Sequence, residues 1–173
     1  KLYGVSGACV AVNAVVRGAC RSADLDLLEV PGGTGGVDTD TIAKARVVEE
    51  NIRRYDFVYL HVKGTDNASH DGNIELKIKM IEKIDAMACH LLDHLNLDET
   101  YITITADHTT SLRERDHRGD PVPLAIMGPD VRRDTVTSYG ERACATGGLG
   151  RVRGIDLMPI LMNLLGRAPL YGS

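Results

Sequence analysis

The sequence has no tryptophan and one phenylalanine, so a hydrophobic core has to be built almost entirely from aliphatic side chains. This scarcity of aromatic rings argues against the stacking platforms that bind single-stranded nucleic acids. The net charge is −4, which lacks the positive excess that draws a protein to nucleic acid or to an anionic membrane surface. We therefore expect neither nucleic acid nor a membrane as the main partner.

Membrane-spanning and secretory signals are also missing. No apolar run approaches the ~18–20 residues of a membrane span, and residues 1–7 lack an apolar leader segment. The sequence contains no CxxC pair, and its four cysteines stand far apart, at Cys9, Cys20, Cys89 and Cys144. Widely spaced cysteines of this kind predict reduced, mostly buried thiols in a cytoplasmic protein.

The length and composition are those of one folded domain. The chain has 173 residues, within the ~100–200 residues usual for a domain. Hydrophobic residues make up 43% and charged residues 25%, as in globular rather than disordered proteins. We expect a single α/β domain over residues 1–173. Because the chain begins with Lys1 and not with methionine, we also expect it to be a piece of a longer protein.

Apolar runs alternate with helical patterns along the chain. Apolar or β-rich runs predict strands at residues 5–12, 27–30, 56–63, 101–106 and 121–127. Helices are predicted at residues 15–23, 39–55, 73–97 and 156–165, with Gly166 ending the last one. The helix at 73–97 is the clearest, and we expect one stripe of it to face the core: Ile74, Ile78, Ile81, Ile84, Ala88, Leu91 and Leu95. Residues 31–36, 64–72 and 107–120 are predicted loops. This alternation indicates an α/β fold with a mostly parallel sheet flanked by helices.

Carboxylate and imidazole groups gather after two of the expected strands. They are Asp66 and His70 after residues 56–63, and Asp107, His108 and His117 after residues 101–106. Ligands of open α/β sheets bind beyond the carboxyl ends of the strands, so we expect all five groups at one rim. A mixed Asp and His set suits Mn²⁺, Zn²⁺, Co²⁺ or Mg²⁺. Five groups exceed what one tetrahedral ion takes, which predicts two ions ~3.5–4 Å apart.

Other polar residues carry weaker signals. Arg17, Lys63 and Arg151, or Arg153 in place of Arg151, could bind a phosphate or carboxylate, although exposed or structural roles compete for each. His90 and His94 stand one helical turn apart, but no third ligand is evident, so we interpret them as a surface pair. Asp71 and Asp120 could orient His70 and His117 or act in turns. The loop charges Glu114, Arg115 and Asp116 are interpreted as solvated.

Three segments carry a specific resemblance: HVKGTDNASHDGN at 61–73, TADHTTSLRERDHRGDPVP at 105–123 and ERACATGGLGRVRGIDLMPIL at 141–161. They resemble the archaeal-type cofactor-independent phosphoglycerate mutases of the alkaline phosphatase superfamily. The match extends upstream through VPGGTGGVDTD at 30–40 to nearly the start of the chain. The Asp and His set is common to the superfamily, whereas GDPVP and GGLGR point to this branch.

The resemblance implies a fold, a ligand set and a missing part. The fold would be an incomplete alkaline-phosphatase-like core. One metal would be held by Asp66, His70 and His117, and a second by Asp107 and His108 with ligands outside this chain. The ions would be divalent, with Mn²⁺ as first choice, and no 2,3-bisphosphoglycerate would be needed. The family's nucleophilic serine has no counterpart here, so no catalytic residue is assigned and the isolated chain is predicted to be inactive.

The implied reaction of the intact protein is the interconversion of 3-phosphoglycerate and 2-phosphoglycerate through a phosphoserine, as in glycolysis and gluconeogenesis. Two alternatives stay open: another phosphatase or phosphomutase of the superfamily, and a stand-alone, non-catalytic metal-binding domain. A sheet that lacks its N-terminal strands would leave an open edge, which predicts self-association of the isolated chain.

Overall fold

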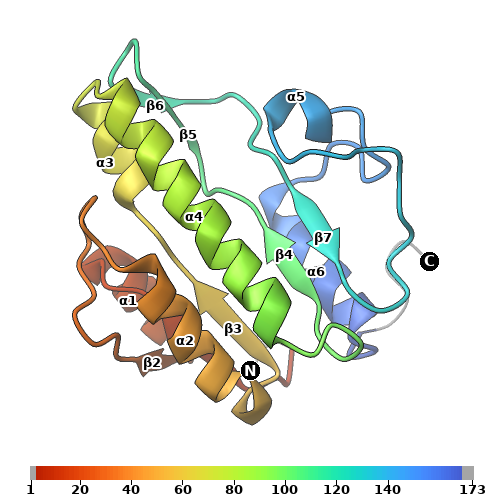
Figure 1. Ribbon diagram of the computed structural model, residues 1–173. Helices are drawn as coiled ribbons and strands as arrows, with labels where there is room; N and C mark the ends of the chain where they lie inside the picture. Colours follow the sequence, from red (N-terminus) through yellow and green to blue (C-terminus); the bar gives the residue numbers. More distant parts are fainter. Residues whose placement is uncertain (1–2, 169–173) are drawn as a thin grey trace. The chain divides into compact units, whose positions relative to one another are not determined.

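The computed structural model describes residues 3–168, and Figure 1 shows their helices and strands. The chain divides into two compact units, which are described separately. Unit 1 consists of residues 5–95 and 110–118. Unit 2 consists of residues 3–4, residues 96–109 and the described residues from 119 onward. The single domain expected for residues 1–173 stays a prediction.

Unit 1 is built on a parallel sheet of three strands in the order β2-β1-β3. The strands are β1 (Gly7–Val10), β2 (Asp26–Leu28) and β3 (Phe57–Leu60). The register places Ala8 opposite Asp26 on one side and Val58 on the other. All four residues of β1 are buried, as expected for a central strand covered on both faces. The predicted α/β fold with a parallel sheet flanked by helices is confirmed.

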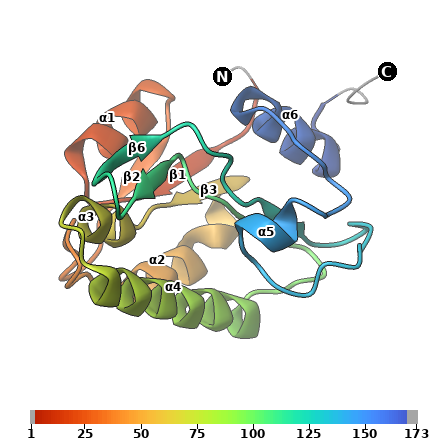
Figure 2. The ribbon, with the colours of Figure 1, turned by 90° about the horizontal axis from the view of Figure 1, so that it is seen from above.

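Helices cover both faces of this sheet. Helix α1 (Ala14–Ser22) lies on one face, and α2 (Thr41–Asn51), with the short turn η1 (Ile52–Arg54), lies with α4 (Ile74–His94) on the other (Figures 1 and 2). The core between the sheet and the α2–α4 layer contains Val10, Ala45, Val47, Val48, Met87 and Leu91. The smaller core on the α1 side contains Cys9, Ala11 and Cys20.

Polar side chains cap these three helices. The Asn13 side chain accepts from the N–H groups of Val15 and Val16 at the start of α1. Asp40 accepts from the N–H of Ala43 at 2.9 Å and thereby caps α2. Asn73 caps α4 in the same way. Each side chain satisfies a backbone donor that the helix itself leaves unpaired, which fixes where the helix begins.

The predicted apolar stripe of α4 is wrong over its first half. Ile74, Ile78 and Ile81 are at least half exposed, at 58%, 50% and 51%. The buried residues of this helix are Met80, Met87 and Leu91. Both faces of the helix are apolar near its start, so spacing alone did not identify the face that packs against the core.

The predicted loop at residues 64–72 is also wrong, because it contains helix α3 (Gly64–His70). The buried residues of α3 are Gly64, Ala68 and Ser69, which are too small to produce an apolar periodicity in the sequence. Gly64 lies so close to α4 that an added Cβ would stand 2.5 Å from the Met80 Cε atom. Small side chains therefore let α3 pack tightly against α4.

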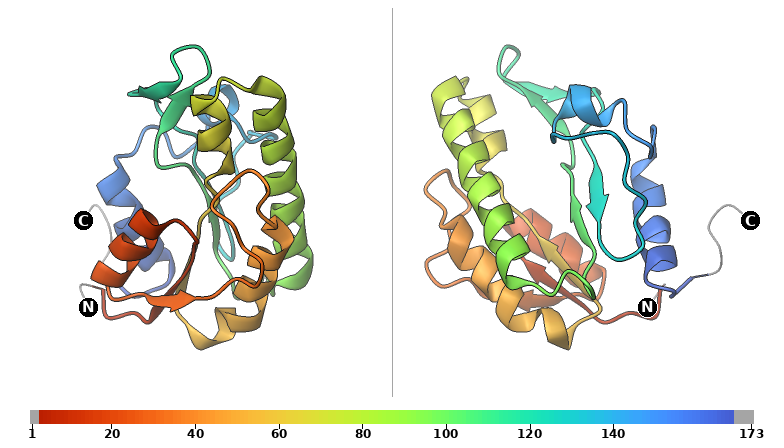
Figure 3. Two further views of the ribbon diagram at one scale, coloured as in Figure 1. Left: turned by 90° about the vertical axis from the view of Figure 1, so that its left-hand side faces the viewer. Right: turned by 45° about the vertical axis from the view of Figure 1, so that its right-hand side comes forward.

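The predicted loop at residues 107–120 contains two short paired strands, β5 (Thr109–Ser111) and β6 (Asp116–Arg118). We call the segment from Thr109 to Arg118 the β5–β6 hairpin. All three residues of β6 are exposed, so no alternation of apolar and polar residues marked it in the sequence. The two views of Figure 3 show the hairpin from two sides.

Unit 2 pairs β4 (Ile102–Ile104) with β7 (Ala125–Met127) in an antiparallel arrangement. It also contains α5 (Glu141–Cys144) and α6 (Gly154–Leu164). Gly166 ends α6 as predicted: its φ is +65°, and its N–H donates to the carbonyl of Asn163. The N–H of Arg167 donates to the carbonyl of Met162, which completes the motif that closes the last turn.

Two sequence expectations concern exposure and membranes. Cys9 and Cys20 are buried and unpaired as expected, whereas Cys89 is exposed and Cys144 is half-buried. In the part of the chain that the structure describes, no helix combines the length and the apolar character needed to cross a membrane.

Candidate metal centre

The candidate site begins at the carboxyl end of β3. After Leu60 the chain passes through His61, Val62 and Lys63 into α3, which carries Asp66 and His70. Residues four apart lie on the same face of a helix, so the two side chains point the same way. The third side chain is His117, which lies on β6 of the hairpin.

The three side chains bring their donor atoms together. Asp66 Oδ1 lies 3.3 Å from His70 Nε2 and 3.5 Å from His117 Nε2. The two Nε2 atoms are 3.2 Å apart. Four ligands at ~2.0–2.2 Å from a tetrahedral ion lie roughly 3.3–3.6 Å from one another. We call these three atoms, Asp66 Oδ1 and the Nε2 atoms of His70 and His117, the triangle. Its distances match three corners of a tetrahedral site, with the fourth corner left for water or substrate.

The orientation of His70 favours a cation. Its Nδ1 lies 2.8 Å from the carbonyl oxygen of Arg115, which can only accept a hydrogen bond. In a neutral imidazole the proton is then on Nδ1, and Nε2 presents its lone pair to the triangle. A lone pair next to a carboxylate oxygen is an electron-rich arrangement that a divalent cation stabilises.

Asp66 is held in its charged form. Its side chain is 13% exposed, and Lys63 forms an ion pair with Oδ2. The Thr110 hydroxyl donates to Oδ1 at 2.6 Å. Burial alone would raise the pKa of Asp66, but the hydrogen bonds from Lys63 and Thr110 and the charge of Lys63 hold it at about 2. The carboxylate is therefore ionised throughout the neutral range.

The sequence analysis missed two residues of this site. Thr110 contacts Asp66 through its hydroxyl, and its neighbours in the sequence gave no reason to select it. Arg115, interpreted as a solvated loop charge, orients His70 through its backbone carbonyl. That role was suggested for Asp71, whereas the partner of His70 Nδ1 is the Arg115 carbonyl. A backbone oxygen carries no sequence signal, because every residue has one.

Asp107 and His108 belong to unit 2 and form a pair there. His108 Nε2 lies 3.6 Å from Asp107 Oδ2, and the Asp107 side chain is 64% exposed. The N–H of His108 donates to Asp107 Oδ1 at 3.1 Å. A carboxylate oxygen and an imidazole nitrogen, both possible metal ligands, therefore lie next to each other. Asp66, His70 and His117 form a separate group of three.

The three basic residues selected from the sequence differ in their surroundings. Lys63 pairs with Asp66 at the site itself. Arg17 on α1 forms an ion pair with Glu29 at 2.6 Å and donates to the carbonyl of Ala11 at 3.2 Å. Arg151 in unit 2 is exposed. Lys63 is thus the one whose contacts connect it with a candidate metal ligand.

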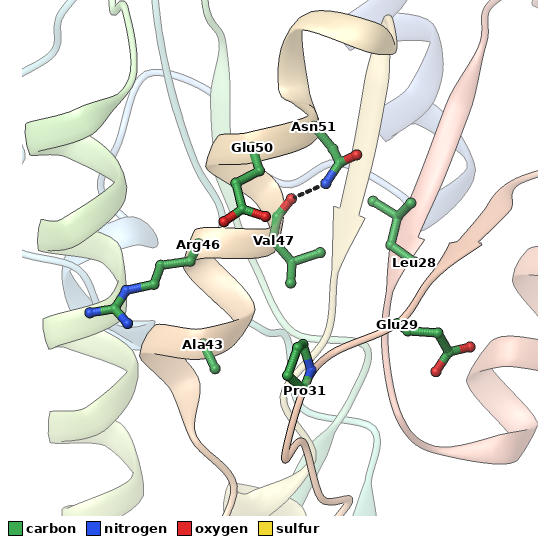
Figure 4. A pocket seen from close by; sticks show the side chains of 8 residues that line it. All are labelled: Leu28, Glu29, Pro31, Ala43, Arg46, Val47, Glu50 and Asn51. Carbon is green, nitrogen blue, oxygen red and sulfur yellow. Dashed lines mark hydrogen bonds between the residues drawn. The ribbon is translucent and has the colours of Figure 1, made fainter.

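A cavity of about 350 Å³ lies between the end of β2 and helix α2. Figure 4 shows its lining residues, among which Arg46 points away from Glu29. Neither histidine nor cysteine occurs among the eight residues that line it, and the Asp66 triangle is not part of it. The triangle, and not this cavity, is therefore the candidate metal site.

Comparison with known proteins shows the family of this chain. Residues 1–164 match the metalloenzyme superfamily, and the chain belongs to that family.

Individual relatives show which members of the superfamily this chain is similar to. The chain is 46% identical over 168 residues to the 2,3-bisphosphoglycerate-independent phosphoglycerate mutase of Thermococcus gammatolerans, covering 97% of this chain and 41% of the relative. It is 43% identical over 171 residues to phosphoglycerate mutase 1 of Methanocaldococcus jannaschii, covering 99% and 42%. The predicted resemblance to archaeal phosphoglycerate mutases is confirmed. The chain spans about two-fifths of the length of these relatives.

Two solved structures superpose on this chain. A protein of Pyrococcus horikoshii superposes with a TM-score of 0.95 at 43% identity, over 99% of this chain and 52% of that one. The cofactor-independent phosphoglycerate mutase of Thermoplasma acidophilum superposes with a TM-score of 0.71 at 28% identity, over 92% and 37%.

Proposed function

We propose that this chain is the metal-binding, C-terminal part of a phosphoglycerate mutase that interconverts 3-phosphoglycerate and 2-phosphoglycerate. The observation that carries the proposal is the Asp66, His70 and His117 triangle in a chain whose relatives are named as such mutases. The nucleophilic serine of the phosphoserine intermediate would lie outside this chain. The enzyme would be an isomerase of the cytoplasm, independent of 2,3-bisphosphoglycerate.

Each part of the site has a task in this proposal. Asp66, His70 and His117 would hold one divalent cation, and Asp107 and His108 would supply ligands to a second. Bound cations offset charge on a transferring phosphoryl group and lower the pKa of a hydroxyl nucleophile. Mn²⁺ is our first choice because of the resemblance to the archaeal phosphoglycerate mutases, and Asp oxygen and His nitrogen donors also suit Zn²⁺, Co²⁺ and Mg²⁺.

Basic side chains would bind the anionic substrate. Lys63 stands beside Asp66, and its side chain is 34% exposed, so it could contact a phosphate as well as the carboxylate. Arg17 would have to release Glu29 before binding a substrate anion. Arg151 is exposed and free to reach one if the substrate binds beside unit 2.

The test is turnover by the whole gene product that contains this chain. Loaded with Mn²⁺, it should convert 3-phosphoglycerate to 2-phosphoglycerate, followed by ³¹P NMR without 2,3-bisphosphoglycerate. Asp66→Asn should abolish conversion. Hydrolysis of an aryl phosphate with no mutase activity would instead indicate another phosphatase of the superfamily. Metal binding without either activity would indicate a non-catalytic metal-binding domain.

A further inference from the structure

The β5–β6 hairpin contacts every donor of the triangle. His117 lies on its second strand, and the Arg115 carbonyl in its turn faces His70 Nδ1 at 2.8 Å. Thr110 on the first strand donates its hydroxyl to Asp66 Oδ1 at 2.6 Å. The Thr110 contact differs from the other two, because it holds the Asp66 carboxylate rather than involving a histidine.

Thr110 is itself held firmly. Thr110 is 6% exposed, and its backbone carbonyl accepts a hydrogen bond from Lys77 Nζ of α4 at 3.0 Å. The strand that carries the hydroxyl is thus anchored to a helix of 21 residues. A fixed donor can impose an orientation on its acceptor, whereas a mobile one would follow it.

The oxygen that Thr110 contacts is the one that faces both histidines. The Oδ1 atom lies within 3.5 Å of both Nε2 atoms, while Lys63 pairs with Oδ2. The last torsion of an aspartate side chain has a broad energy minimum, so the carboxylate turns easily unless both oxygens are held. Lys63 and Thr110 hold one oxygen each, which stops this rotation.

We infer that Thr110 is a positioning residue of the metal centre, and that its hydroxyl aims Asp66 Oδ1 at the position where a divalent cation binds between His70 and His117. The inference rests on the proposed metal centre and adds a residue that does not touch the metal. Contacts that orient metal ligands typically change metal affinity by ~10–100-fold.

Two substitutions in the whole gene product test the role of the hydroxyl. Thr110→Val keeps the shape of the side chain and removes the donor, and it should weaken Mn²⁺ binding by about 10-fold in calorimetric titration. Thr110→Ser keeps the donor and should bind Mn²⁺ close to the wild-type affinity. With Co²⁺, Thr110→Val should also shift the visible absorption bands of the wild-type complex, because these bands report ligand geometry.

Thr41→Val is the matched control. Thr41 is 4% exposed, and its hydroxyl donates to the carbonyl of Lys83 at 3.1 Å, away from the triangle. Its loss should lower thermal stability much as Thr110→Val does, without changing Mn²⁺ affinity. Equal affinity losses in both valine variants would overturn the positioning role, because they would show a general loss of stability.

Asp66→Asn separates this inference from the proposed metal centre. If Asp66→Asn abolishes Mn²⁺ binding and Thr110→Val keeps the wild-type affinity, the role of Thr110 is wrong and the metal centre stands. If Asp66→Asn binds Mn²⁺ as tightly as the wild type, the metal centre itself is wrong, and the inference about Thr110 is wrong with it.

Discussion

Two helices of unit 1 each carry a pair of polar side chains four residues apart, with different surroundings. Asp66 and His70 on α3 meet a third donor, His117, within 3.5 Å. His90 and His94 on α4 stack their rings at 4.0 Å. His90 pairs with Glu49 of α2, and His94 Nδ1 donates to the carbonyl of His90.

The difference shows that spacing along a helix does not make a metal site. Both pairs have the right separation for two ligands of one ion. The α3 pair contacts a hairpin that brings a third candidate ligand, His117, and hydrogen-bonds to the other two side chains. The α4 pair instead contacts α2 through His90. His90 and His94 were interpreted as a surface pair; His94 is exposed, whereas the His90 side chain is only 16% exposed and contacts Glu49.

The largest expected effect comes from removing His117, the third candidate ligand beside the α3 pair. His117→Ala should reduce Mn²⁺ affinity by more than the ~10–100-fold typical of residues that only orient ligands. His94→Ala should leave the affinity unchanged. Calorimetric titration of both variants measures this, and equal losses would contradict a metal site that contains His117 and not His94.

A second test uses the charge of the α3 pair. The folded pKa of Asp66 is about 2, below its ordinary value of 3.8, so its stabilising contribution is present above about pH 4 and lost as pH falls through about 2. In metal-free protein, Asp66→Asn should cost about 1–2 kcal/mol at pH 7, allowing for solvent screening. Urea unfolding measures the loss, which should shrink between about pH 4 and pH 2 and vanish only below pH 2; a loss independent of pH would exclude this origin.

A third test strains the backbone between α3 and α4. Gly72 has a φ of +67°, and an added Cβ would stand 2.5 Å from Arg115 Nε. Gly72→Ala should therefore destabilise the protein by about 1 kcal/mol, because alanine is strained at this φ. Metal binding should change little, because the Arg115 side chain can move aside while its carbonyl still contacts His70. Gly18→Ala in α1 is the control, because its Cβ would meet no neighbour within 4 Å. Thermal unfolding should show it neutral or stabilising.

The smallest effect belongs to the α4 pair. His90→Ala removes the contact with Glu49, whose side chain is 36% exposed. Such partly exposed pairs contribute roughly 0–1 kcal/mol, so thermal unfolding should show only a small loss. Mn²⁺ affinity should not change. A marked fall in affinity would mean that the α2–α4 contact shapes the metal centre.

The sequence predicted most elements because their patterns are long or distinctive. The apolar run 5–12 contains β1, and the helix expected at 73–97 is α4 (Ile74–His94). Helix α3 was not predicted, because its buried residues, Gly64, Ala68 and Ser69, are too small to give an apolar pattern. The paired strands β5 and β6 have three residues each, too few for a periodic pattern.

The candidate ligands could be selected from the sequence, but their supporting contacts could not. Asp66, His70 and His117 were chosen because Asp and His bind divalent cations and because their motifs resemble a metal-dependent family. Thr110 and the Arg115 carbonyl act through a fold that brings residues more than 40 positions apart together. No local pattern encodes such contacts. The metal ligation itself stays a prediction.

Metal content tests the central claim most directly. The whole gene product and its Asp66→Ala variant would be loaded with Mn²⁺, freed of weakly bound ions, and analysed for manganese per chain by atomic emission. We predict that the wild type retains a tightly bound ion that the variant loses, with both proteins equally folded by circular dichroism. Equal manganese content in the two proteins would contradict a metal centre at Asp66, His70 and His117.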